Sequence, residues 1–308
     1  MERKETPDQT TGVPEEPGFP GEVVDNIIDH LHDDSPSLAK SSLVCHAWLP
    51  SCRYHLFHTI FCCPTSQAKD LYHLLDWLLA SPDVRPYINT LLFMTPVTHR
   101  ETPPPEVSVE DMGKALSYLP SLRSLCVFRV SLSSSRNPWQ DSYVSPINNS
   151  PNLESLAIME CKTSDDTLNP LFFFLGLFRR VAALQIQDST CSYNSSMPFA
   201  HLLELAQHFY SCRMVLMFAT HDSIIPGMEG AICSLFDILP PDAKWPLRGI
   251  NMMSPALILD GSVARMIEGC KESLEMIWID IGSVYDLDLQ RERPLSENRS
   301  IVRLVACN

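Results

Sequence analysis

Apolar residues near the start of the chain recur at the spacing of an amphipathic helix. Val24, Ile27, Ile28 and Leu31 stand at i, i+3, i+4 and i+7. This spacing places all four side chains on one side of an α-helix. Pro20 precedes them, and proline suits the entry of a helix because its φ is already close to the helical value. The pattern therefore predicts a short first helix that buries an apolar stripe.

Two more short helices are predicted after a break at residues 33–36. In the second helix, Leu38, Ser42 and Cys45 share one face. Leu43 and Val44 lie on another face, so this helix is apolar on more than one side. The apolar positions of the third helix are Leu49, Cys52, Leu56, Phe57 and Ile60. A bundle of about 40 residues is usually too small for its own hydrophobic core to stabilise it. We therefore expect a partner to cover its remaining apolar surface.

A different pattern repeats from residue 88 onward: an apolar residue, two variable residues, an apolar residue, one variable residue and another apolar residue. Clear copies are Ile88/Leu91/Phe93, Leu122/Leu125/Val127, Leu153/Leu156/Ile158, Val181/Leu184/Ile186, Leu247/Ile250/Met252 and Leu274/Ile277/Ile279. Weaker copies are Cys212/Val215/Met217 and Ile301/Leu304/Ala306. Successive copies begin 27 to 35 residues apart. This is the pattern of a strand in a leucine-rich repeat, with longer steps than usual.

Helical patterns accompany these strands, at residues 71–79, 109–119, 168–178, 199–209, 228–239 and 262–270. One strand-and-helix unit cannot bury its apolar side alone, whereas stacked units bury a continuous core. We therefore expect an irregular leucine-rich-repeat-like α/β solenoid with a parallel sheet over residues 85–308. A doubly wound α/β domain would satisfy the same alternation and stays open as an alternative.

The side chains that alternate with the inward apolar ones are expected on the accessible, concave face of this sheet. Methionine and aromatic side chains there suit the capture of an apolar segment of a partner protein. The candidate substrate-binding residues are Met94, Phe128, Met159, Gln187, Phe218, Met253 and Trp278. The alternative is that the parallel strands are buried on both faces and these side chains simply pack.

Composition narrows the classes of function. The 308 residues are 45% apolar and carry a formal charge of −14, which argues against a nucleic-acid partner because phosphate binding needs clustered Lys and Arg. No glycine-rich nucleotide-binding motif is present, and no apolar run approaches the ~20 residues of a membrane span. We expect no cofactor and no membrane partner, a cytoplasmic or nuclear location, and a disordered acidic tail at residues 1–17.

Metal-binding and catalytic patterns are weak. His55, His58, Cys62 and Cys63 stand at i, i+3, i+7 and i+8, so a helix could gather three of them around zinc. A fourth ligand is missing, and we expect a packed helix end and no metal. No local signature selects a nucleophile and base from ten His and eleven Cys. We expect a non-catalytic protein, with a Cys/His hydrolase-like enzyme as the less favoured alternative.

The first helical region also carries a resemblance to a known family. The series Pro20, Glu22-Val23-Val24, Ile28 and Leu31, followed by Leu43-Val44-Cys45 and Trp48, resembles the F-box motif. Phe19 stands where that family usually has leucine. The resemblance implies that residues 18–61 are an F-box that docks onto a Skp-type adaptor in a cullin-based ubiquitin ligase. The residues implied in this contact or in its support are Phe19, Pro20, Val23, Val24, Ile27, Leu31, Leu43, Val44 and Trp48.

The rest of the chain resembles the tails of fungal F-box proteins with degenerate leucine-rich repeats. Apolar spacing predicts a linker helix within residues 62–84, and the resemblance implies that the repeat region holds an unknown protein substrate. The chain would then be the substrate-recognition adaptor of a Skp-cullin-F-box ubiquitin ligase. An F-box scaffold that works outside ligases, and a helical subdomain packed on its own chain, stay open as alternatives.

Overall fold

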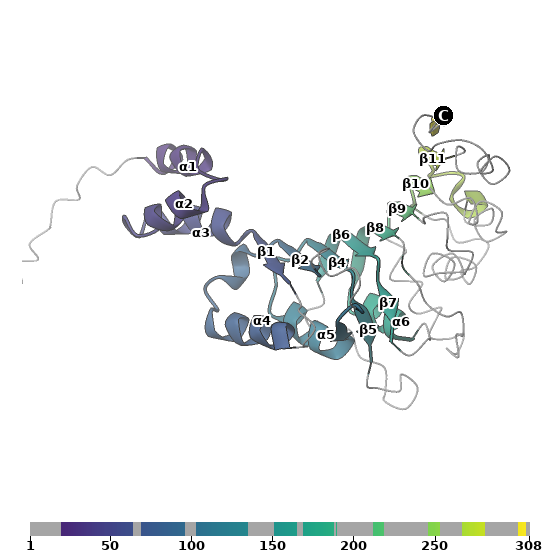
Figure 1. Cartoon of the computed structure of the whole chain (residues 1–308). Helices are drawn as coiled ribbons and strands as arrows, with labels where there is room; N and C mark the ends of the chain where they lie inside the picture. The colour runs from purple at the N-terminus through teal and green to yellow at the C-terminus, as the bar shows by residue number, and fades with distance from the viewer. Residues whose placement is uncertain are drawn as a thin grey trace, which may run out of the picture. The chain divides into compact units, whose positions relative to one another are not determined.

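The structure is a computed structural model of the whole chain, in which the chain forms two units, Met1–Leu56 and Phe57–Asn308 (Figure 1). The residues that it describes are 20–63, 69–95, 103–134, 151–164, 169–187, 189, 212–218, 246–252, 267–280 and 301–305. The first unit is helical and the second combines helices with parallel strands. The molecule is thus a mixed α/β protein with helices at its N-terminal end.

The first unit holds the three predicted helices. They are α1 (Gly21–Asp29), α2 (Ser35–Ser41) and α3 (Leu49–Phe57). Their shared core consists of Val24, Ile28, Leu38 and Cys52. Helix α2 ends at Ser41, so the expectation that it continues to Cys45 is wrong.

The N-terminus of α2 is fixed by a side-chain cap. The carboxylate of Asp34 accepts hydrogen bonds from the backbone N–H of Ser37 at 3.1 Å and from its hydroxyl at 2.6 Å. Such a cap satisfies a backbone donor that has no partner within the helix. The two hydrogen bonds also lower the pKa of Asp34, the hydroxyl contributing more than the backbone.

The third predicted helix stops earlier than its apolar spacing suggests. Helix α3 ends at Phe57, and Thr59–Cys62 forms strand β1, which pairs in parallel with β2 (Thr90–Met94). Ile60 therefore lies on a strand. For the same reason, the idea that one helix could bring His55, His58, Cys62 and Cys63 together is wrong.

The second unit is organised around one large sheet. Its strand order is β1-β2-β4-β6-β8-β9-β10-β11-β12, so each strand lies beside the next main strand of the chain. Eight of the described strands are mutually parallel. Besides β1 and β2, the strands are β4 (Ser124–Phe128), β6 (Asn152–Met159), β8 (Arg180–Gln187), β9 (Met214–Phe218), β10 (Gly249–Met252), β11 (Met276–Asp280) and β12 (Ile301–Val305).

The register of this sheet follows the sequence repeat. Leu91 pairs with Leu125, which pairs in turn with Leu156, and Leu156 pairs with Leu184. A doubly wound domain would reverse its strand order at a switch point, and the described strands show no reversal, so that alternative is wrong. Strand β12 is antiparallel to β11, so the weak copy at Ile301 does not continue the parallel series.

A small second sheet runs alongside the first and was not predicted. It consists of β3 (Glu106–Ser108), β5 (Ser131–Ser133) and β7 (Lys162–Thr163), again parallel and in chain order. At two equivalent corners between the sheets, Arg129 and Glu160 adopt the left-handed conformation with φ of 56° and 51°. Their backbone N–H groups still donate to the adjacent main strand, to Met159 and Gln187, at 2.8 and 2.7 Å.

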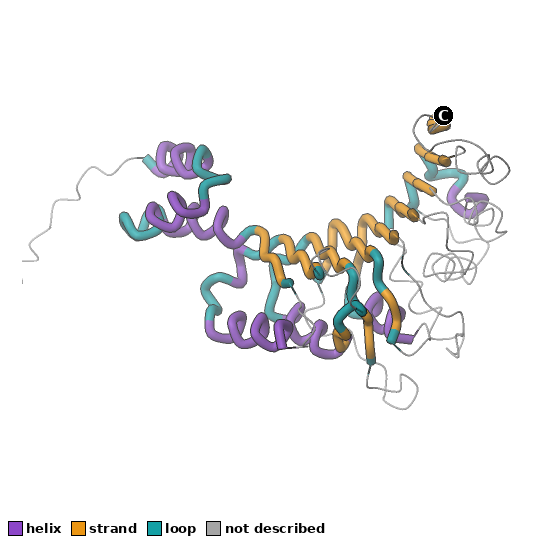
Figure 2. The backbone as a smooth tube through the Cα atoms, viewed as in Figure 1, coloured by secondary structure: helices purple, strands orange, loops and turns teal. Residues whose placement is uncertain are grey.

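The helices pack on one side of the large sheet. The longer described helices of this unit are α4 (Lys69–Ala80), α5 (Val109–Ser117) and α6 (Asn169–Gly176), with a 3₁₀ turn η1 at Arg85–Tyr87. Residues 267–270 are also helical, at the end of the helix predicted at 262–270. Figure 2 shows α4, α5 and α6 on the same side of the strand row as the second sheet. The buried side chains of these helices and the inward side chains of the main strands form one hydrophobic core. Helices predicted at 199–209 and 228–239 lie outside the described residues, and so does most of 262–270.

Candidate functional site

Helix α1 carries two adjacent apolar rows with opposite environments. Val24 and Ile28 are buried in the bundle core, and Ile28 is 0% exposed. Val23 and Ile27, which are also four residues apart, remain exposed at 40% and 41%. Since four-residue spacing aligns side chains along a helix, α1 presents an aliphatic row that its own bundle does not cover.

The turn after α2 exposes two more aliphatic side chains. Leu43 is 85% exposed and Val44 is 63% exposed. Their backbone N–H groups donate to the carbonyls of Lys40 and Ser41, both at 3.1 Å. The turn is therefore held by its own hydrogen bonds while both side chains face solvent. Neighbouring exposed aliphatics of this kind are typical of a surface that binds another protein.

The predicted adaptor-binding residues fall into two groups. Pro20, Val23, Ile27, Leu43 and Val44 are exposed and available for contact. The others support the bundle: Val24 is in its core, and Leu31 and Trp48 pack against that core. Phe19 lies outside the described residues.

Polar contacts hold α1 against α3. The hydroxyl of Ser51 donates to the carboxylate of Asp25. Nε2 of His55 lies 2.8 Å from Oδ1 of Asp29. Each of these contacts contributes little stability by itself, but together they fix how the two helices are rotated about their axes. They keep the exposed row of α1 on the surface.

The large sheet of the second unit has one open face among the described residues. Along β2, β4, β6 and β8, buried side chains alternate with half-buried ones. Leu91 is buried under the helices, for example, whereas its neighbour Leu92 is half-buried on the other face. These strands are therefore more deeply buried on the helix-covered face than on the other face.

Four predicted substrate-binding residues form a row across this open face. Met94, Phe128, Met159 and Gln187 occupy matching positions on four neighbouring strands and are all half-buried. Nε2 of Gln185 lies 3.7 Å from the sulfur of Met159. Phe218 and Trp278 lie on β9 and β11, but their side chains are outside the description, as is the whole of Met253.

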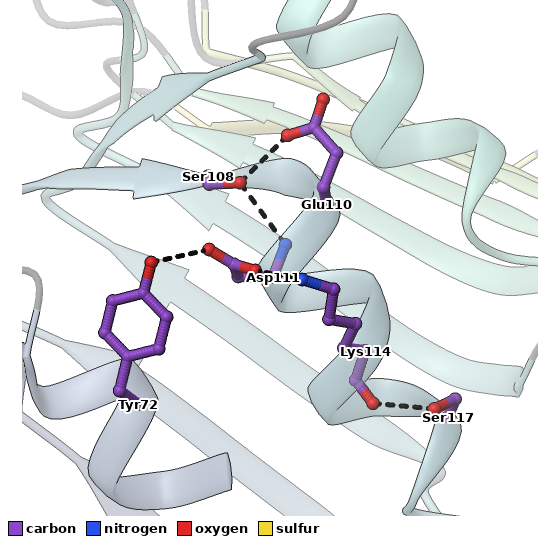
Figure 3. A network of polar contacts seen from close by, with 6 residues as sticks. All are labelled: Tyr72, Ser108, Glu110, Asp111, Lys114 and Ser117. Carbon is purple, nitrogen blue, oxygen red and sulfur yellow. Dashed lines mark hydrogen bonds and ion pairs between the residues drawn. The ribbon is translucent and has the colours of Figure 1, made fainter.

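A cavity of about 220 Å³ lies on the helix-covered side of the second unit. Its lining residues are Leu71, Tyr72, Phe93, Glu106, Val107, Ser108, Asp111 and Ser133. Figure 3 shows the polar groups here bonded to one another. Ser108 caps α5 at the N–H of Asp111, and Asp111 pairs with Lys114 at 2.7 Å and accepts from the Tyr72 hydroxyl at 3.1 Å. These contacts show that Ser108 and Asp111 stabilise the start of α5, which accounts for their presence in the cavity wall.

The buried thiols are poorly suited to nucleophilic catalysis. Burial raises the pKa of Cys161, Cys212 and Cys270 to about 12. A thiol needs a lowered pKa to react as the thiolate at neutral pH, so these three stay protonated. Within the described residues no three His, Cys, Asp or Glu side chains gather closely enough to hold a metal ion.

Comparison with known proteins adds no relative. No protein-family model matches the sequence, and a search of curated proteins finds no match either. In the part of the chain that the structure describes, no helix is both long and apolar enough to cross a bilayer.

Proposed function

We propose that this chain is an F-box-type adaptor, whose helical unit binds a Skp-type protein and whose second unit binds a protein substrate for ubiquitin transfer. The observation that carries the proposal is the exposure of Val23, Ile27, Leu43 and Val44. These four belong to the nine residues that the resemblance implies in the adaptor contact or in its support. They lie on the surface while the positions between them form the core.

The energetics favour a partner on this surface. Burying the exposed part of each of these aliphatic side chains contributes on the order of 1 kcal/mol or more, so the four together favour a complex. The cost of ordering is small because α1 is a regular helix and the turn after α2 is hydrogen-bonded. A helical bundle of this size buries little apolar surface by itself. A partner that covers these side chains would therefore add to the apolar surface that the bundle buries.

The second unit supports the finer interpretation as a leucine-rich-repeat-like solenoid. Its main strands follow one another in chain order, and each apolar repeat position pairs with the equivalent position of the next repeat. Such stacking creates an extended face made of many strands. We infer that the open row from Met94 to Gln187 receives an apolar segment of the substrate.

The mechanism would be one of proximity. A protein held by the second unit, while the first is held in a cullin complex, presents its lysines at a high effective concentration to the charged ubiquitin carrier. No catalytic residue is needed in this chain. Such a role belongs in the cytoplasm or the nucleus, where ubiquitin transfer takes place.

The test is affinity purification of the full chain from cells, with and without proteasome inhibition, followed by mass spectrometry. We expect Skp-type and cullin peptides in both samples and additional partners that appear only with the inhibitor. Recovery of the Skp-type adaptor without cullin would identify a scaffold that works outside ligases. Absence of the adaptor from both samples would contradict the proposal.

A further inference from the structure

Exposed arginines gather at one edge of the large sheet, where strands β8, β9 and β10 begin. Arg179 and Arg180 stand at the start of β8, Arg213 directly precedes β9 and Arg248 directly precedes β10. All four side chains are exposed. The three strands are neighbours in the sheet, as Figure 1 shows.

Backbone hydrogen bonds fix the positions of these arginines. The N–H of Arg213 donates to the carbonyl of Ala182 at 2.7 Å. The carbonyl of Arg213 accepts from the N–H of Arg248 at 2.7 Å and from that of Gly249 at 3.1 Å. Neighbouring strands lie about 4.8 Å apart, so Arg213 and Arg248 are held side by side despite their like charges.

Ion pairing among the described residues leaves three of these charges uncompensated. Arg248 pairs with Glu275 at 3.4 Å. Farther along the same edge, Arg123 pairs with Glu154 at 3.2 Å. Arg179, Arg180 and Arg213 make no ion pair with any residue that the structure describes. We call these three residues the arginine edge.

We propose that the arginine edge binds a carboxylate-rich segment of a partner protein. Guanidinium groups form charge-assisted, often bidentate, hydrogen bonds with carboxylates. The three arginines are distributed along the edge and exposed, which matches several anionic groups in a row better than one phosphate in a convergent pocket. The site is separate from the apolar row of the open face, and it does not depend on the partner of the helical unit.

The charge of the whole chain shapes this interaction. With a formal charge of −14, the protein repels acidic partners at long range, but physiological salt screens such repulsion beyond about 8 Å. Attraction is then local and directs the acidic segment to the arginine edge. The same net charge disfavours a nucleic acid, which would bring its phosphates close to much of the surface.

The experiment measures the binding of fluorescein-labelled glutamate peptide, about eight residues long, to the purified full chain by fluorescence anisotropy at physiological salt, which screens the long-range repulsion. A variant with Arg179→Glu, Arg180→Glu and Arg213→Glu should bind about tenfold more weakly or worse, because three attractive contacts become repulsive. The matched control carries Lys40→Glu, Arg123→Glu and Lys162→Glu. Lys40 and Lys162 are exposed away from this edge, and Arg123 is already paired with Glu154. Replacing these three residues changes the net charge equally, so the control should lose less than about threefold.

Three outcomes would overturn the proposal. The first is no binding by the wild-type chain, and the second is an equal loss in both variants, which would indicate a net-charge effect. The third is tighter binding of a single-stranded oligonucleotide, or of a neutral peptide with one phosphoserine, than of the glutamate peptide. Circular dichroism should show that both variants remain folded. Failure of the adaptor purification leaves this result unaffected, so the two proposals fail separately.

Discussion

Two isoleucines that follow one another on α1 have opposite environments and allow a matched comparison. Ile28 is fully buried in the bundle core, whereas Ile27 is exposed. We expect Ile28→Ala to destabilise the helical unit by about 2–5 kcal/mol through lost burial and a cavity. Ile27→Ala should cost under about 1 kcal/mol. Hydrogen exchange of the α1 amides in the full chain measures both, and equal losses would mean that α1 is rotated differently.

The cap of α2 makes its stability dependent on pH. Hydrogen bonds from Ser37 lower the pKa of Asp34, so the folded state favours the carboxylate. The stabilisation is therefore complete above the ordinary pKa of an aspartate and is lost as the pH falls through the lowered value. We expect hydrogen exchange at the Ser37 amide to quicken, relative to an unfolded peptide, over that acidic range. Asp34→Asn retains a capping oxygen but cannot titrate, so a persistent pH response in this variant would refute the explanation.

At the scale of elements, apolar spacing predicted most of the strands and several helices. The repeat identified the main strands from β2 to β11, and in β2, β4, β6 and β8 its apolar residues lie on the buried face. It also fits Phe57, Ile60 and Cys62, which begin 31 residues before Ile88. Phe57 and Ile60 also continue the helical spacing of the preceding residues, so the sequence predicts a helix there and not strand β1. The strands of the second sheet are two or three residues long, too short to show alternation.

The open face of the large sheet predicts different costs for two adjacent leucines. Leu91 lies under the helices and is 0% exposed, while Leu92 lies on the open face. Leu91→Ala should destabilise the second unit by about 2–5 kcal/mol, and Leu92→Ala by under about 1.5 kcal/mol. Urea unfolding followed by circular dichroism measures the difference. Equal costs would show that another part of the chain covers this face.

The corner between β6 and β7 predicts a stabilising substitution. Glu160 has a φ of 51°, a conformation that costs residues other than glycine roughly 1–2 kcal/mol. Glu160→Gly should therefore leave the second unit as stable as before or more stable, by up to about 1 kcal/mol. In contrast, Glu154→Gly within β6 should destabilise it, because glycine weakens a regular strand. Thermal unfolding compares the two variants, and a clear loss with Glu160→Gly would contradict the interpretation of this corner.

At the scale of the whole molecule, sequence reasoning predicted a helical start and a parallel sheet in chain order. The apolar spacing placed Val24 and Ile28 on the buried side of α1, as the structure shows, but it placed Ile27 there too, and this is wrong because the packing of the bundle leaves Ile27 41% exposed. The arginine edge was also missed. Arg180 on β8 and Arg213 before β9 are more than thirty residues apart in the sequence. Only the order of the strands in the sheet brings them to the same edge.

The central claim is that the exposed aliphatics of the helical unit bind a Skp-type adaptor. The most direct test is calorimetric titration of purified adaptor into the full chain with Leu43→Asp, compared with Leu79→Asp. Both leucines are exposed, at 85% and 52%, but Leu79 lies on α4 in the second unit. We predict that Leu43→Asp weakens adaptor binding by about a hundredfold, as expected for an interface anchor, and that Leu79→Asp binds like the wild type. Undiminished binding with Leu43→Asp, or no binding by the wild-type chain, would contradict the claim.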